Sequence, residues 1–170
     1  VTEKNANLVY EFQSGGINEA FSDMAGETAE YYLKSQVGKT NDWLIGGAVI
    51  KGPAGTALRY FQDPTRDGQS IDNARDYRDT MNVHYTSGVY NKAFYNLATT
   101  PDWGIRKAFE VFLTANRVYW ANDETFDSAA CGVLRAANDL TYKTEDVIAS
   151  FKDVGVNATC STTPPEPSPN

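Results

Sequence analysis

Residues 17–35 read INEAFSDMAGETAEYYLKS and carry the strongest helical pattern in the sequence. The side chains expected on its inner face recur at spacings of three and four, and are Ile17, Phe21, Met24, Thr28 and Tyr31. We expect Gly15 and Gly16 to break the chain, so that the helix begins near Ile17 and ends near Ser35. Strand patterns are weak throughout. The sequence therefore predicts a mainly α fold with long ordered loops and little β structure.

Further helical segments follow in the second half of the chain. The predicted ranges are Ser87–Leu97, Ile105–Trp120, Ser128–Asn138 and Thr144–Val154. Glu145 and Asp146 place acidic residues in the first turn of the last segment, where they favour a helix start. Residues 37–83 are rich in Gly, Pro, Asp and Asn, and we expect a long ordered loop with a short helix around Ala54–Phe61.

The composition is ordinary for a globular protein with an acidic surface. The chain has 170 residues, of which 41% are hydrophobic and 22% charged, with a net charge of −7. A nucleic-acid binder would show a clustered basic surface, and none is visible. No run approaches the roughly 18 apolar residues of a membrane helix. No signal peptide is visible either, which leaves a processed chain or an internal piece.

The two cysteines, Cys131 and Cys160, are not spaced as the C-x-x-C of redox motifs and zinc fingers. A bridge between them would close a loop of about 30 residues and contribute roughly 3–4 kcal/mol in the chain-entropy model. Composition alone leaves both a disulfide and two unrelated thiols open.

Four carboxylates share one face of the first long helix. With Glu19 at zero on a helical wheel, Asp23, Glu27 and Glu30 fall near about 40°, 80° and 20°. One interpretation is a solvated acidic face, in which Lys34 pairs with Glu30. The other is a cation site, because Glu27 and Glu30 at i,i+3 can hold a hard cation through oxygen. Asp23 could then orient a neighbouring ligand.

His84 is the only histidine in the chain. It could be a structural residue or a group that stabilises a developing oxyanion, with Asp79 as a hydrogen-bond acceptor for one ring nitrogen. A catalytic zinc site usually has three protein ligands, and this chain offers Glu19 and at most one imidazole. We therefore expect that the chain alone does not complete such a site.

The run QSGGINEAFSD at residues 13–23 closely resembles the thermolysin family of zinc metallopeptidases, nearest to the vibriolysin and pseudolysin branch of bacterial enzymes. Further runs resemble successive landmarks of that branch: ALRY at 57–60, RDGQSIDN at 66–73, VHYTSGVYN at 83–91, RKAFEVF at 106–112, ACGV at 130–133 and VGV at 154–156. They keep one order over about residues 1–160, so the resemblance is specific. It implies the helical C-terminal lobe of such an enzyme.

The resemblance implies a role for each catalytic candidate. Glu19 would be the third zinc ligand, and Asp23 would be the partner of a zinc-ligating histidine. His84 would stabilise the transition state with Asp79 orienting it, and Tyr10 would add a hydrogen bond to the oxyanion. These roles imply a catalytic Zn²⁺ ion.

The resemblance also assigns substrate and structural residues. Arg59 would bind a substrate carbonyl, and Leu58 and Ile45 would line the pocket for a hydrophobic residue after the cleaved bond. Cys131 and Cys160 would form a disulfide. A structural Ca²⁺ ion would be bound by Glu27, Glu30, Asp42 and the carbonyl of Leu44.

One part of the family pattern is missing. An H-E-x-x-H helix supplies two zinc histidines and the water-activating glutamate in this family, and its second histidine would fall just upstream of Val1. We therefore expect residues 1–160 to be one lobe that needs an N-terminal lobe as partner, and residues 161–170 to be a Ser/Thr/Pro-rich linker.

The function expected from the resemblance is that of a secreted, zymogen-derived, extracellular bacterial metalloendopeptidase. The full-length enzyme would be a monomer acting on peptides, without nucleic-acid or membrane partners. The alternative is a non-catalytic, calcium-stabilised helical module that binds a partner, and the 170-residue chain taken literally belongs to that class.

Overall fold

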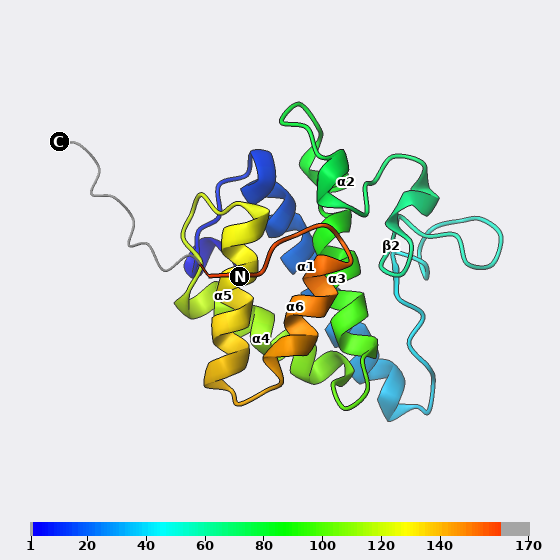
Figure 1. Ribbon diagram of the computed structural model, residues 1–170. Helices are drawn as coiled ribbons and strands as arrows, with labels where there is room; N and C mark the ends of the chain where they lie inside the picture. Colours follow the sequence, from blue (N-terminus) through cyan, green and yellow to red (C-terminus); the bar gives the residue numbers. More distant parts are fainter. Residues whose placement is uncertain (1, 161–170) are drawn as a thin grey trace.

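The computed structural model describes residues 2–160, whose helices form a bundle with a long loop region on one side (Figure 1). The elements in chain order are η1 (Thr2–Lys4), α1 (Phe12–Gln36), β1 (Leu44–Ile45), β2 (Arg59–Tyr60), η2 (Pro64–Asp67), η3 (Ala74–Asp76), α2 (Val83–Thr86), α3 (Gly88–Thr99), α4 (Gly104–Val118), α5 (Phe126–Asp139) and α6 (Thr144–Lys152). The predicted mainly α class is confirmed. The predicted linker at residues 161–170 lies outside the described residues.

The first helix, α1, begins at Phe12 rather than near Ile17, so the predicted chain break at Gly15 and Gly16 is wrong. Both glycines are buried inside the helix, where α2 packs against them. A Cβ atom on Gly15 would collide with Val83, and one on Gly16 would collide with Thr86. The glycines therefore let two helices approach closely instead of ending one.

The position of Glu19 changes as a result. It lies about two turns inside α1 rather than in its first turn. Farther along the same helix, Phe21 and Met24 are buried as predicted, whereas Tyr31, which was expected on the same inner face, is exposed like most residues in the last turns of α1.

The centre of the bundle is α3, which packs against α1, α4 and α6. Its Tyr90 and Phe94 meet Phe112 of α4 and Phe151 of α6, and all four side chains are fully buried. The Tyr90 hydroxyl donates a hydrogen bond to the carbonyl oxygen of Phe126 at 2.6 Å. Burying such aromatic side chains supplies much of the driving force for folding.

The loop region between α1 and α2 is ordered by a short antiparallel ladder, in which Leu44 of β1 lies opposite Tyr60 of β2. The helix predicted around Ala54–Phe61 is wrong, because this segment ends in β2. Gly55, with a φ of 82°, helps to turn the chain before that strand. Trp43 anchors the ladder by packing on Phe61, Phe94 and Tyr95.

The end of the described chain is fastened in two ways. Cys131 and Cys160 form a disulfide with a Cα–Cα distance of 4.9 Å, which confirms the bridge that the resemblance implied. The backbone N–H of Ala74 donates a hydrogen bond to the Val154 carbonyl at 2.8 Å, which ties the segment after α6 to the loop region between α1 and α2.

Candidate functional site

The close contact between α1 and α2 brings three of the predicted residues together. The Nε2 atom of His84 on α2 lies 3.5 Å from Oε2 of Glu19 on α1. The Tyr10 hydroxyl, from the segment before α1, donates a hydrogen bond to Oε1 of Glu19 and lies 3.3 Å from His84 Nε2. Residues from three separate segments therefore face one point.

Tyr10 is expected to be protonated, as a hydrogen-bond donor must be. Burial, together with the hydrogen bond to Glu19, raises the pKa of Tyr10 to about 12. The phenol therefore keeps its proton at neutral pH and remains able to donate a hydrogen bond. The His84 side chain is 46% exposed and that of Glu19 is 18% exposed, so a ligand can reach both.

The other ring nitrogen of His84 has a partner that we did not predict. Its Nδ1 atom lies 2.7 Å from Oδ1 of Asn82, the residue at the N-cap of α2. The predicted partner, Asp79, lies instead beside the hydroxyl of Tyr77, where burial and the neighbouring carboxylate raise the pKa of Tyr77 to about 12. An Asn N-cap two residues before a histidine is a sequence signal that could have indicated this contact.

Asp23 is buried and held by nitrogen donors from two residues. The guanidinium of Arg59 donates from Nε to Oδ2 at 2.7 Å and from Nη2 to Oδ1 at 2.6 Å. Asn91 of α3, which we also missed, donates from Nδ2 to Oδ2 at 2.9 Å. Arg59 uses two of its five N–H donors on Asp23. It can therefore orient Asp23 and still contact another acceptor.

A cavity of about 570 Å³ opens beside this cluster. Its lining includes Ile50, Leu58, Arg59 and His84, so an apolar wall and the candidate catalytic histidine share one space. The predicted pocket residue Ile45 packs against the hydrophobic core, and its carbonyl accepts a hydrogen bond from the Leu58 N–H at 2.8 Å. The structure thus places Leu58 on the wall and Ile45 behind it.

Glu27 lies deeper in α1 and is fully buried. Its Oε1 atom accepts a hydrogen bond from Asn41 Nδ2 at 2.6 Å, while Glu27 Oε2 and Asn41 Oδ1 are buried without a hydrogen-bond partner. Burial raises the pKa of Glu27 to about 7, although the Asn41 hydrogen bond acts in the opposite direction. Unpartnered buried oxygens of this kind are the donor set that a hard cation such as Ca²⁺ prefers.

The other two predicted calcium carboxylates, Glu30 and Asp42, both pair with a lysine. Lys34 Nζ lies 2.8 Å from Glu30 Oε1 and 2.7 Å from Asp42 Oδ2, which also confirms the predicted Glu30–Lys34 pair. The backbone N–H of Leu44 donates to Asp42 Oδ1 at 3.3 Å. A cation bound here would compete with the Lys34 ammonium for the same carboxylates.

Within residues 2–160, no three His, Cys, Asp or Glu side chains are grouped so that they could hold a metal ion. The chemistry of Glu19 and its open face suits one ligand of a zinc ion, and a usual zinc site needs further protein ligands. No helix in the same described part of the chain is long and apolar enough to cross a membrane.

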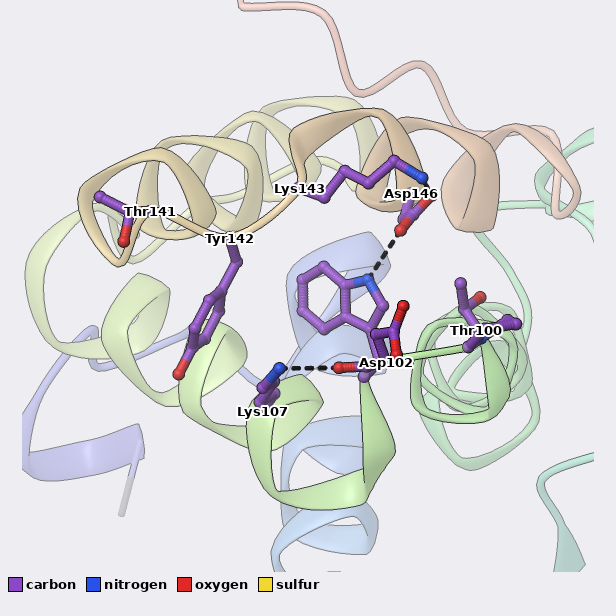
Figure 2. Close-up of a pocket in the computed structure, with 9 residues that line it drawn as sticks. Thr100, Asp102, Lys107, Thr141, Tyr142, Lys143 and Asp146 are labelled. Atoms are coloured by element: carbon purple, nitrogen blue, oxygen red, sulfur yellow. Dashed lines mark hydrogen bonds and ion pairs between the residues drawn. The ribbon is translucent and has the colours of Figure 1, made fainter.

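A second cavity, of about 390 Å³, lies at the junction of the segment before α4 and the α5–α6 turn (Figure 2). The Trp103 indole donates to Asp146 Oδ2 at 3.0 Å, and Lys107 donates to the backbone oxygen of Asp102 at 2.7 Å. Lys143 pairs with Asp146 at 2.9 Å. None of the predicted site residues lines this cavity.

Comparisons with known proteins find similar proteins over almost the whole chain. Residues 6–156 match the family model described as the thermolysin metallopeptidase, alpha-helical domain. The chain is 54% identical over 164 residues, 96% of its length, to the hemagglutinin/proteinase of Vibrio cholerae, of which it spans 26%. It is 54% identical over 161 residues, 95% of its length, to a zinc metalloprotease of Helicobacter pylori, of which it spans 60%.

A solved structure resembles the whole bundle. The precursor of protealysin, a metalloproteinase from Serratia proteamaculans, aligns with a TM-score of 0.79 and 27% identity. The alignment covers 92% of this chain and 54% of that one. The chain therefore corresponds to part of a longer protein in each of these comparisons.

Proposed function

Because the chain belongs to the thermolysin family of metallopeptidases, in which it matches the alpha-helical domain, we propose that it supplies the substrate-side half of a zinc-dependent endopeptidase. The single observation that carries the proposal is the convergence of Tyr10, Glu19 and His84 on one open point. A second lobe would provide the other zinc ligands and the base that activates water.

In this proposal, Glu19 is the zinc ligand that the chain provides. Zinc, when bound, lowers the pKa of a water molecule and polarises the scissile carbonyl. The buried Asp23, fixed by Arg59 and Asn91, would accept a hydrogen bond from a zinc-ligating histidine of the second lobe and so orient its ring.

Tyr10 and His84 would stabilise the oxyanion that forms when the carbonyl is attacked. The phenol keeps its proton, and His84 presents Nε2 to the same point, so both can donate a hydrogen bond to the developing charge once His84 is protonated. Removing one such donor typically lowers the rate by about 10²–10³. We assign Asp79 no direct contact with the reacting atoms.

The cavity beside His84 would hold the residue that follows the cleaved bond. Leu58 and Ile50 give it an apolar wall, which favours hydrophobic side chains, and Arg59 at its edge would bind a substrate carbonyl with an N–H that Asp23 leaves free. Ile45 would act by supporting Leu58 rather than by touching the substrate.

We also propose a structural Ca²⁺ ion at Glu27, Glu30, Asp42 and the Leu44 carbonyl. It is supported by the buried, unpartnered Oε2 of Glu27, which a cation would satisfy. These three carboxylates are not grouped to hold a metal ion as they stand, so the proposal requires that Lys34 releases Glu30 and Asp42 and that their side chains turn towards Glu27 when the ion binds.

An extracellular location is part of the same proposal. Disulfides such as Cys131–Cys160 persist in oxidising environments, and one relative is named a virulence metalloprotease of Vibrio anguillarum.

The proposal is tested on the full-length protein that contains this chain. Purified protein should hydrolyse casein, lose that activity in a zinc chelator and regain it with zinc. Glu19→Gln should lower the zinc content as well as the activity, whereas Glu145→Gln on the exposed side of α6 should change neither. Chelator-resistant hydrolysis, or a Glu19→Gln protein that keeps its zinc, would refute the zinc assignment. A metal-replete protein that cleaves no peptide would favour a non-catalytic, calcium-stabilised module.

A further inference from the structure

Asn82 contacts His84 at two atoms with one oxygen. Its Oδ1 accepts a hydrogen bond from the His84 backbone N–H at 3.0 Å and lies 2.7 Å from the ring atom Nδ1. A backbone N–H can only donate, so the amide atom facing it is the oxygen and not the NH₂ group. Because an amide oxygen only accepts, the Nδ1 atom beside it must carry a proton.

This contact decides which face of the imidazole is presented to the site. With Nδ1 protonated and turned to Asn82, the ring directs Nε2 towards Tyr10 and Glu19, at 3.3 and 3.5 Å. The other neutral tautomer would place the lone pair of Nδ1 against a lone pair of Oδ1 at hydrogen-bond distance, which is repulsive. Asn82 therefore selects both the ring orientation and the tautomer.

No other contact in the cluster holds the ring as closely. The distances from Nε2 to Tyr10 and Glu19 are longer than the usual hydrogen-bond range, and the His84 side chain is 46% exposed. Without Asn82, the ring would be free to rotate about its side-chain bonds towards solvent.

We propose that Asn82 is the positioning residue of His84, and that its neutral amide performs the orienting function we expected from the carboxylate of Asp79. This inference rests on the proposed function, in which His84 stabilises the transition state through Nε2. Asn82 would touch neither substrate nor metal, and its whole effect would pass through the imidazole.

Asn73 serves as a control for the helix-capping role of Asn82. Asn82 caps α2, and Asn73 caps η3 in the same manner, with Oδ1 accepting from the Arg75 N–H at 3.2 Å. Asn73 makes no contact with a histidine ring. Losing a cap costs about 0.5–2 kcal/mol of stability, and Asn73→Ala controls for that cost.

The first experiment measures kcat and KM of the zinc-loaded, full-length enzyme with a short peptide. We expect Asn82→Ala to lower kcat by about 10- to 100-fold with little change in KM, because a misplaced catalytic group costs rate rather than binding. Asn82→Asp should stay close to the wild type, since a carboxylate oxygen can accept from both His84 atoms. Asn73→Ala should have wild-type kcat.

The inference is overturned if Asn82→Ala turns over as fast as Asn73→Ala, or if Asn82→Asp is as slow as Asn82→Ala. If the wild type itself hydrolyses no peptide, the proposed function has failed. If the wild type is active, His84→Ala is impaired and Asn82→Ala is not, the positioning role alone has failed.

A second measurement does not depend on activity. The ¹⁵N chemical shifts of the His84 ring, assigned by comparison with His84→Ala, report which nitrogen carries the proton. We expect a protonated Nδ1 in the wild type and in Asn82→Asp, and a mixture of tautomers in Asn82→Ala if that variant folds. A wild-type ring with an unprotonated Nδ1 would contradict the proposal.

Discussion

The cavity beside His84 and the cavity around Trp103 are both lined by charged and aromatic residues. They differ in whether the polar groups already have close hydrogen-bond partners within the protein. Around Trp103, Lys107, Lys143 and Asp146 each have a close partner inside the protein (Figure 2). Beside His84, the ring atom Nε2 has only loose contacts with Tyr10 and Glu19, at 3.3 and 3.5 Å. Polar groups that are positioned but not saturated have binding capacity left for a ligand, and this property separates the two cavities better than size does.

The largest expected effect comes from removing the imidazole of His84, whose Nε2 atom has no close hydrogen-bond partner. His84→Ala in the full-length enzyme should lower kcat by about 10²–10³ while the zinc content stays unchanged, because Glu19 remains in place. Turnover and metal content are measured on the same sample. Near-native hydrolysis by this variant would remove the distinction between the two cavities.

The next effect concerns the contact that brings His84 to Glu19. Gly16→Ala places a Cβ against Thr86 of α2, and such overpacking should cost about 1–3 kcal/mol and also lower kcat by displacing α2. The matched control is Gly26→Ala in the same helix, where an added Cβ meets nothing within 4 Å. The control should gain about 0.5–1 kcal/mol in helix stability. Chemical denaturation compares the two, and equal stability of both variants would contradict the close packing.

Glu27 offers a third case of a polar group without a close partner, because its buried Oε2 atom has no hydrogen bond. The pKa of the buried carboxyl is raised from 4.5 to about 7, so the stability that depends on its neutral form is fully present below about pH 4.5 and is lost as the pH rises through about 7. In a calcium chelator at about pH 8, Glu27→Gln should therefore be more stable than the wild type by about 1–2 kcal/mol.

Calcium should reverse that order. The ion needs the charged carboxylate, so added Ca²⁺ should stabilise the wild type and leave the Gln variant almost unchanged. Thermal unfolding with chelator and with Ca²⁺, at about pH 5 and pH 8, measures both effects. A wild type that does not respond to Ca²⁺ would show that Lys34 alone balances these carboxylates.

The sequence predicts the helices better than the links between them. The segments from residue 87 to 154 show clear apolar periodicity, and α3 to α6 lie close to the predicted ranges. Two adjacent glycines locally indicate a helix break, but Gly15 and Gly16 lie inside α1 because Val83 and Thr86 of α2 pack too closely for a side chain there. That contact joins residues about 70 positions apart, and no local pattern contains it.

The candidate site likewise contains residues that could be identified from the sequence and a contact that only the structure shows. The resemblance to a known family supplied Tyr10, Glu19 and His84, and the structure places them together. It pointed to Asp79 as the partner of the ring, but the contact is made by Asn82, whose side chain caps α2 and therefore lies beside His84. The N-cap residue Asn82, two positions before His84, was the sequence signal for this contact, but recognising it requires knowing that α2 begins at Val83, which the sequence pattern did not show.

The smallest expected effect concerns the cavity around Trp103, where the polar groups already have partners. Trp103→Phe removes the indole N–H and leaves Asp146 with Lys143 as its partner, so it should cost about 0.5–1.5 kcal/mol of stability. Because no group with free hydrogen-bonding capacity is lost, kcat and KM of the full-length enzyme should equal those of the wild type. Denaturation and peptide hydrolysis are measured in parallel. A change in KM without a loss of stability would mean that the Trp103 cavity also binds substrate, and the contrast between open and saturated polar groups would then no longer identify the site.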